Sequence, residues 1–223
     1  MKSKASAHWS IFENVRKDLV GLFGFINGII IDIGCGSAPF RKEIEKIGMS
    51  YIGIDIPSQI ERSDFLSRSD NIDIFGDCLE LPVKNASVDT VFSSFVIEHI
   101  FDYQKLFSEA YRVLKKNGHF ILVSPLINVL HEEPHDYFRY TNYALERIAT
   151  KEAFKVVEIK KSGGEILFMG HLIANHLMKT KKRLKADRCC ERLSFIIQRL
   201  SLILDRRFSS SSFVCNYVSA FKK

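Results

Sequence analysis

Residues 28–36 read GIIIDIGCG, a run of β-branched residues that ends in two glycines separated by one residue. Such a run, which is apolar except for Asp32, is typical of a strand that is buried on both faces of a parallel sheet. Glycines directly after it predict a tight loop without Cβ bulk, where a ligand can come close to the backbone. The stretch therefore predicts the first strand of an α/β fold, with a nucleoside site at its carboxyl end.

The same alternation of strands and helices continues outward from this loop. A helix that runs from Asp102 to the Asn117-Gly118 pair is the clearest of the intervening helices, because Asp102 can cap its first turn and Gly118 can end its last. Alternating elements predict a doubly wound, Rossmann-like sheet, mostly parallel, with an antiparallel strand at the C-terminus. Further strands are expected at residues 51–54, 72–75, 88–93, 119–124, 155–160 and 213–221.

The length of 223 residues suits one α/β domain, and no repeat or long linker divides it. We therefore expect a single domain over residues 1–223. Its parts are a helix at 8–25, a core at 28–125, a substrate loop at 126–141, a helical insertion at 165–206 and a last strand at 213–221.

Charge is unevenly distributed along the chain. The net charge is +6, but residues 1–150 carry −4 and residues 151–223 carry +10. Such asymmetry indicates that the C-terminal part meets something anionic, although a solvated basic helix face has the same pattern. The longest charge-free apolar stretch, residues 19–31, is shorter than a membrane span, and the five cysteines lack disulfide or zinc spacing. These features predict a cytoplasmic protein, or one that is peripheral to a membrane.

Acidic residues follow the predicted strands at places where a nucleoside would need them. Asp55 lies 19 residues after Gly36, close to the spacing of about 20 expected of a ribose-binding carboxylate. Asp32 ends the first strand, and Asp77 follows the third. A dinucleotide fingerprint requires a third glycine where Pro39 stands, so binding of a pyrophosphate is disfavoured.

Four segments in this order resemble the successive motifs of class I methyltransferases, and in particular the type 11 methyltransferase domain. They are IIIDIGCGSAPF, YIGIDIP, GDCLELPVKNASVDTVFSSFVIEHI and VLKKNGHFILVSP, which cover about residues 29–125. The resemblance implies S-adenosylmethionine as cofactor and S-adenosylhomocysteine as product. By the resemblance, the cofactor-binding residues are Asp32, Gly34, Cys35 and Gly36 at the methionine end, Asp55 and Ile56 at the ribose, Asp77 and Cys78 at the adenine, and Ser94 and Phe95 along the pocket.

Some of these residues have simpler roles open to them. Asp77 could be a turn residue, because aspartate side chains hydrogen-bond to the backbone of turns. Cys35 and Cys78 are expected to be pocket-wall residues rather than nucleophiles, since buried thiols are usually inert.

The loop at residues 126–141 leaves the carboxyl end of a strand and is expected to face the transferred methyl group. It contains His131-Glu132-Glu133-Pro134-His135, which matches the string H-E-x-x-H, but Pro134 is incompatible with the helix that a zinc protease needs. We therefore expect no metal site. The stretch PHDYFRYT is similar to one in bacterial methyltransferases, including some linked to surface-glycan synthesis.

Histidines are the candidate bases for an acceptor hydroxyl. His135 is the first candidate, oriented by Asp136, and His99 is the second; each could equally be a structural histidine. The substrate-contacting residues are expected to be Asp136, Tyr137, Arg139 and Tyr140.

The function favoured by these observations is O-methylation of a small molecule or a glycan sugar by in-line displacement. A lipid-linked acceptor is the alternative if residues 166–207 contact an anionic membrane surface. Those basic helices could also form a lid, a contact between copies of the chain or a packed helix pair. A non-catalytic nucleoside-binding protein and a nicotinamide dehydrogenase are other readings, and a nucleic-acid substrate is disfavoured because no RNA-binding signature is present.

Overall fold

The computed structural model describes residues 8–47, 50–56, 71–181, 187–210 and 212–223. Residues 182–186 of the predicted helical insertion lie outside the described residues. The chain divides into two compact units. Unit 1 comprises Met1–Val20 and Lys161–Asn216, and unit 2 comprises Gly21–Lys160 and Tyr217–Lys223. The expectation of a single domain stays a prediction.

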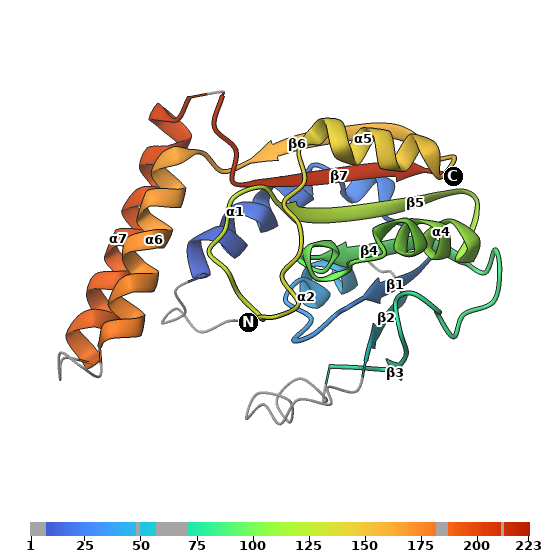
Figure 1. Cartoon of the computed structure of the whole chain (residues 1–223), viewed down its shortest axis with the longest axis horizontal. Helices are drawn as coiled ribbons and strands as arrows, with labels where there is room; N and C mark the ends of the chain where they lie inside the picture. The colour runs from blue at the N-terminus through green and yellow to red at the C-terminus, as the bar shows by residue number, and fades with distance from the viewer. Residues whose placement is uncertain (1–7, 48–49, 57–70, 182–186, 211) are drawn as a thin grey trace. The chain divides into compact units, whose positions relative to one another are not determined.

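The described residues form one seven-stranded sheet with strand order β3-β2-β1-β4-β5-β7-β6 (Figure 1). The sheet is mostly parallel, with antiparallel strands at the C-terminal end of the chain, so the predicted Rossmann-like fold class is confirmed. Its strands are β1 (Ile29–Ile33), β2 (Ser50–Asp55), β3 (Ile74–Phe75), β4 (Val88–Ser94), β5 (Leu114–Pro125), β6 (Lys155–Ser162) and β7 (Asn216–Lys222).

Helices follow the strands as the alternating pattern predicts. Helix α2 packs on β2, and α4 packs on β5. Both α4 and α5 begin at a side-chain cap, since Asp102 accepts a hydrogen bond from Lys105 N and Thr141 accepts one from Ala144 N. The helices are α1 (Trp9–Val20), η1 (Phe23–Phe25), α2 (Arg41–Glu45), η2 (Ile97–His99), α4 (Tyr103–Val113), α5 (Asn142–Lys151), α6 (Glu165–Thr180) and α7 (Asp187–Phe208).

The core of unit 2 lies around the central strands. Residues 30–33 of β1 are all buried, because β2 and β4 flank the strand in parallel on either side. An aromatic cluster joins α4 to the sheet: Phe107 lies 5.2 Å from Phe120 of β5 and 5.8 Å from Phe221 of β7, between ring centroids. Contacts between rings at these distances add to the free energy gained from burial alone. The cluster therefore fixes α4 against β5 and β7.

Several predicted boundaries are wrong, including that of the strand expected at 72–75, which the structure limits to Ile74–Phe75. The helix expected at 8–25 ends at Val20 and is followed by the short helix η1, because Gly21 and Gly24 interrupt the helical run. The last strand was expected from residue 213 but begins at Asn216, since Cys215 pairs with Gly163 outside the strand.

The helix expected to run to Gly118 ends at Val113, and β5 starts at Leu114 instead of His119. The pairing of β4 and β5 is irregular between Val88 and Thr90, and Asn117 has a φ of +67° within β5. The Asn117-Gly118 pair therefore marks a distortion inside a strand and not a helix end.

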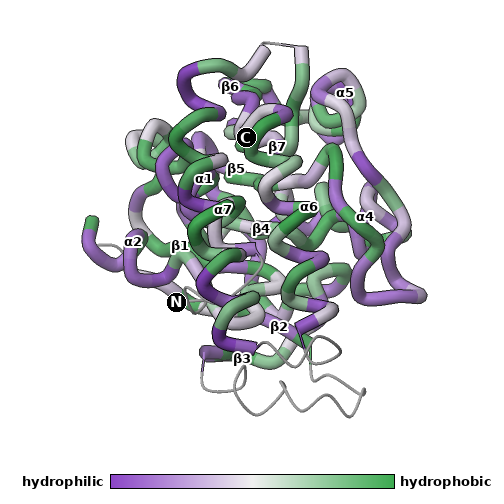
Figure 2. Tube along the Cα trace, turned by 90° about the vertical axis from the view of Figure 1, so that its left-hand side faces the viewer, coloured by the Kyte–Doolittle hydropathy of each residue, from purple (hydrophilic) through white to green (hydrophobic). Residues whose placement is uncertain are grey.

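Unit 1 contains a hairpin of α6 and α7, and α1 contacts both helices. Buried polar side chains of α7 hold the starts of the other two: Gln198 accepts a hydrogen bond from Ser10 N, and Asp205 accepts bonds from Gly164 N and Leu167 N. Hydrophobic and hydrophilic stretches alternate along α6 and α7 in Figure 2. Within the described ranges, no helix is both long enough and apolar enough to cross a membrane.

Candidate active site

The glycine loop follows β1 and is held by the neighbouring strand. Both Gly34 N and Cys35 N donate to the carbonyl of Ile54 in β2, at 2.8 and 3.1 Å. Gly34 and Gly36 have φ angles of +70° and +52°, which favour glycine. A Cβ at Gly34 would lie 2.5 Å from Val96, whereas the space around Gly36 is open apart from Asp55 Oδ2 at 3.9 Å. The loop therefore leaves room for a ligand beside Gly36.

Asp55 ends β2 and is tied to the same loop. Its Oδ2 accepts a hydrogen bond from Gly36 N at 2.7 Å, and its Oδ1 accepts one from Ile56 N at 2.8 Å. Carboxylate oxygens are hydrogen-bond acceptors, the chemistry that ribose hydroxyls require. The side chain of Ile56 is exposed beside them.

Asp32 is fully buried at the end of β1. Its carboxylate accepts a hydrogen bond from the hydroxyl of Tyr51, and burial raises its pKa to about 7. Among the described residues, its Oδ1 has no hydrogen-bond partner. A buried acceptor oxygen in this state fits the ammonium group at the methionine end of S-adenosylmethionine. The residues at the loop therefore fit the cofactor that the sequence resemblance implies.

Asp77 and Cys78 follow β3 in a turn. Asp77 accepts a hydrogen bond from Leu79 N at 2.8 Å, the local pattern that the turn interpretation of this residue expects. Burial raises the pKa of Cys78 to about 12, and it also raises the pKa of Cys35. Both thiols are thus protonated at neutral pH, in line with a role in the pocket wall.

Strand β4 ends beside the glycine loop. Ser94 is buried, and Phe95 has a φ of +56° with its N–H bonded to the carbonyl of Val123 in β5. A non-glycine residue in this conformation costs about 1–2 kcal/mol. This backbone conformation turns the chain from the end of β4 toward η2.

The H-E-x-x-H stretch is a loop, as the sequence predicts. His135 is exposed, and its Nδ1 lies 2.9 Å from the hydroxyl of Tyr137. The expected pairing of His135 with Asp136 is wrong, because Asp136 forms a two-point ion pair with Arg139 at 2.6 and 2.7 Å. This pair lowers the pKa of Asp136 to about 2. Asp136 also accepts a hydrogen bond from the backbone N–H of His131.

Glu98 is a residue of this region that sequence reasoning missed. It lies in η2 beside His99, is fully buried, and burial raises its pKa to about 8. Its backbone carbonyl accepts bonds from Tyr137 N and Phe138 N, which anchors the loop to the end of β4. One signal could have identified it: a lone acidic residue inside the apolar run FVIEHI.

His99, the second candidate base, is partly buried, and burial lowers its pKa. Its Nδ1 lies 2.7 Å from the backbone carbonyl oxygen of His135, so the ring is fixed by the loop. The side chain of His99 is thus held by the main chain of His135, which links the two candidate histidines.

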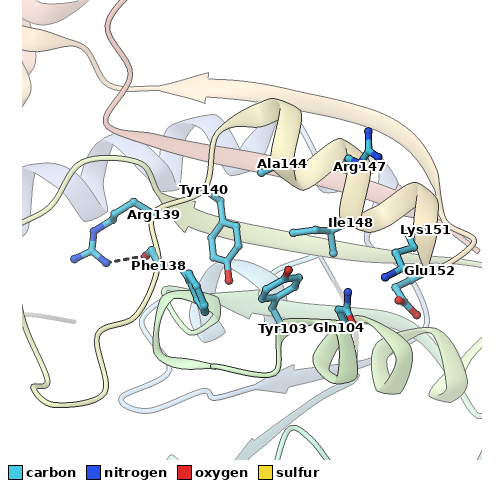
Figure 3. A pocket seen from close by; sticks show the side chains of 10 residues that line it. All are labelled: Tyr103, Gln104, Phe138, Arg139, Tyr140, Ala144, Arg147, Ile148, Lys151 and Glu152. Atoms are coloured by element: carbon cyan, nitrogen blue, oxygen red, sulfur yellow. Dashed lines mark hydrogen bonds between the residues drawn. The ribbon is translucent and has the colours of Figure 1, made fainter.

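A cavity of about 390 Å³ lies beside the loop, between α4 and α5 (Figure 3). The ring of Tyr103 packs edge to face against those of Phe138 and Tyr140 in its lining, and the guanidinium of Arg139 points away. Arg139 and Tyr140 are the two predicted substrate residues among its lining. The full lining is Tyr103, Gln104, Phe138, Arg139, Tyr140, Ala144, Arg147, Ile148, Lys151 and Glu152.

Comparison with known proteins agrees with this geometry. Residues 31–122 match the model of a methyltransferase domain, Methyltransf_11. Over 97 residues the chain is 33% identical to a probable S-adenosylmethionine-dependent methyltransferase of Mycolicibacterium smegmatis, a match that covers 43% of this chain and 37% of that protein. A malonyl-[acyl-carrier protein] O-methyltransferase of Yersinia pestis is 29% identical over 100 residues, or 44% of this chain and 36% of that protein.

These matches span little more than a third of each curated relative. A solved structure covers more: that of a SAM-dependent methyltransferase from Archaeoglobus fulgidus superposes with a TM-score of 0.61 at 19% identity, covering 95% of this chain and 94% of that one. At that identity the likeness concerns the fold. Residues 31–122 therefore match a methyltransferase domain, and the chain has a Rossmann-like fold similar to that of a solved SAM-dependent methyltransferase.

Proposed function

We propose that the protein transfers a methyl group from S-adenosylmethionine to a hydroxyl oxygen of a small molecule or a glycan sugar. The observation that carries this proposal is the loop of Gly34 and Gly36, which is bonded to Asp55 and adjoins the buried Asp32 within the matched domain. S-adenosylmethionine supplies an electrophilic methyl on a sulfonium. Asp55 would hold the ribose, Asp32 the ammonium group, and Asp77 and Cys78 the adenine side.

An oxygen acceptor is preferred because of the chemistry of the loop. Curated relatives include both O- and C-methyltransferases, so the acceptor atom has to be argued from the residues. A hydroxyl must lose its proton as the new C–O bond forms, and the loop presents histidines near the end of β4. In this proposal His135 accepts that proton at Nε2. The hydrogen bond between its Nδ1 and the hydroxyl of Tyr137 holds the ring in place.

The cavity of Figure 3 suits the body of such an acceptor. Its three aromatic rings can pack against an apolar or sugar ring, and Arg147 and Lys151 on its rim would attract an acidic group. Asp136 would act indirectly, because it holds Arg139 in place through their ion pair.

Cofactor binding is tested by comparing two glycine variants. Gly36→Ala places a Cβ at a φ of +52° and next to the proposed cofactor, and we expect at least a tenfold loss of affinity for S-adenosylmethionine by calorimetry. Gly24→Ala is the matched control, because a Cβ there meets nothing within 4 Å. Equal affinity in the two variants would contradict the proposed site.

Methyl transfer is tested with labelled S-adenosylmethionine and fractionated cell extract. We expect the label to enter an acceptor fraction, and we expect His135→Ala to reduce turnover by about 100-fold while cofactor affinity is unchanged. Binding without any transfer would favour a non-catalytic nucleoside-binding protein, and preferential binding of NAD would favour a dehydrogenase.

A second candidate, a lipid-linked acceptor at an anionic membrane surface, is favoured by helix α7. Its buried face is mostly polar: Ser194, Gln198, Ser201 and Asp205 are buried together with Cys190 and Leu202. Its exposed side chains include an apolar stripe at three- and four-residue spacing, and exposed arginines recur every seven residues beside that stripe. The stripe is Leu193, Ile196, Leu200, Ile203 and Leu204, and the arginines are Arg192, Arg199 and Arg206.

An apolar stripe flanked by arginines is the pattern of a helix that lies in a membrane interface. We expect sedimentation with vesicles that contain phosphatidylserine, and weaker sedimentation at high salt. Ile196→Asp with Leu200→Asp should abolish it, whereas the control Glu158→Gln on β6 should not. No sedimentation of the wild-type protein would remove this candidate.

A further inference from the structure

Three side chains lie close together: Glu98 and His99 from η2, and His131 from the loop. Glu98 Oε1 lies 3.9 Å from Nε2 of His99 and 3.9 Å from Nε2 of His131. One ligand atom from each residue can be chosen so that all three lie within 4.8 Å of one another. The two imidazole rings meet edge to face, with their centroids 4.7 Å apart. Two imidazoles and a carboxylate are thus brought together at the carboxyl end of the sheet.

The backbone fixes the protonation of both rings. His99 Nδ1 lies 2.7 Å from the carbonyl oxygen of His135, and His131 Nδ1 lies 3.0 Å from the carbonyl oxygen of Val129. A carbonyl oxygen can only accept, so each Nδ1 carries the proton and donates it. Each neutral ring then has its lone pair on Nε2, the atom next to Glu98. Metal-binding histidines are typically held in this way, by a hydrogen bond from the other ring nitrogen.

Glu98 supplies an independent observation. Its side chain is fully buried, and neither carboxylate oxygen accepts a hydrogen bond from another described residue. The distance of 3.9 Å to each Nε2 is too long for a hydrogen bond. A buried carboxyl group in this state is protonated when alone, and a bound cation would stabilise its ionised form. The spacing is instead close to the edge of a coordination polyhedron, which is about 3.4 Å for ligands about 2.1 Å from a zinc ion.

We propose that Glu98, His99 and His131 bind a divalent transition-metal ion of the type that takes two imidazoles and one carboxylate, such as Zn²⁺ or Fe²⁺. To bind the ion, the side chains would have to close these separations, which are 3.9 Å from Glu98 to each imidazole and at most 4.8 Å within the group, to about 3.4 Å. The sequence does not indicate this site, because His131 is 32 residues from His99 and the H-E-x-x-H string has the wrong geometry for it.

Three protein ligands leave a coordination position open. If the proposed function holds, that position would take the oxygen of the acceptor, and the ion would polarise its O–H bond before methyl transfer. This role rests on the proposed function, but binding of the ion does not.

The test uses the full chain without an affinity tag, after treatment with a chelator. Calorimetry with Zn²⁺ and visible spectra with Co²⁺ should give one ion per chain. We expect His99→Ala and His131→Ala each to weaken binding by at least 100-fold, and Glu98→Gln to weaken it by at least tenfold. His135→Ala is the matched control: it removes a neighbouring imidazole but keeps the carbonyl that holds His99, so affinity should change by less than about threefold.

Several outcomes would overturn the proposal. The first is that the wild-type protein binds the ion no more tightly than a variant that lacks all three side chains. This comparison is decisive even if the single variants fail to fold. Cys189→Ser with Cys190→Ser could abolish binding, which would place the ion on the vicinal cysteines of α7. Affinity for S-adenosylmethionine, measured in parallel, separates the two proposals: it should persist in His131→Ala, and its absence from wild type would contradict the proposed function while leaving the metal site intact.

Discussion

At the scale of single residues, Asp32 makes the cofactor site dependent on pH. Burial raises its pKa to about 7, so the carboxyl is mostly protonated at pH 5.5 and half ionised at pH 7. Only the ionised form attracts the ammonium of S-adenosylmethionine, which itself stays charged up to about pH 7.7. We expect affinity to rise about tenfold between pH 5.5 and 7. Calorimetry should find this rise in the wild-type protein and no such rise in Asp32→Asn.

The same residue predicts the opposite trend for stability without cofactor. The pKa of Asp32 is raised in the folded state, so its contribution to the free energy of unfolding is fully present below about pH 4 and is lost as the pH rises through about 7. Urea unfolding of wild type and Asp32→Asn should therefore diverge over that range, with the variant the less sensitive to pH. Parallel curves for the two proteins would mean that Asp32 is not buried in this way.

At the scale of elements, α6 depends on one side chain of α7. Asp205 accepts hydrogen bonds from Gly164 N at 2.8 Å and from Leu167 N at 2.9 Å, at the start of α6. Asp205→Ala leaves two buried N–H groups without an acceptor, and we expect it to lower the free energy of unfolding by about 2–4 kcal/mol. The exposed Asp187→Ala, at the start of α7 itself, should cost less than about 1 kcal/mol. Urea unfolding measures both, and equal losses would contradict the cap.

Sequence patterns predicted the elements better than their ends. The run from Ile29 to Ile33 and the spacing to Asp55 follow from local rules for buried strands and nucleoside loops, so the fold class and the glycine loop were accessible. The start of β5 was not, because Leu114 continues the apolar spacing of α4 and only its pairing with Val88 makes it a strand residue. Such pairing is a tertiary effect that overrides local propensity.

The same limit applies to the candidate site. A carboxylate that follows a strand can be identified from the chain, but the partner of a loop residue cannot. Asp136 is adjacent to His135 in sequence and pairs with Arg139 in space. The approach of His131 to Glu98 joins residues 33 positions apart, and no spacing rule predicts it. The sequence signal that remains for this site is a charged residue inside an apolar run, such as Glu98 in FVIEHI.

At the scale of the whole molecule, the division into two compact units gives a test of the single-domain expectation. The chain has one tryptophan, Trp9, which lies in unit 1 with its ring 5.1 Å from that of Phe195. Every proposed cofactor residue lies in unit 2. A ligand stabilises the part of a protein to which it binds, by about 2.7 kcal/mol at 100 times its Kd.

If the units unfold separately, S-adenosylmethionine should leave the urea midpoint of Trp9 fluorescence unchanged and should raise the midpoint of a second transition seen by circular dichroism. This result would contradict the single domain that the sequence predicts, for which we expect coincident transitions that both move with the ligand. The variant Asp205→Ala provides the converse check, since it should lower the Trp9 midpoint and leave cofactor affinity as it is. Coincident transitions that both move with the ligand would instead establish one cooperative domain over the whole chain.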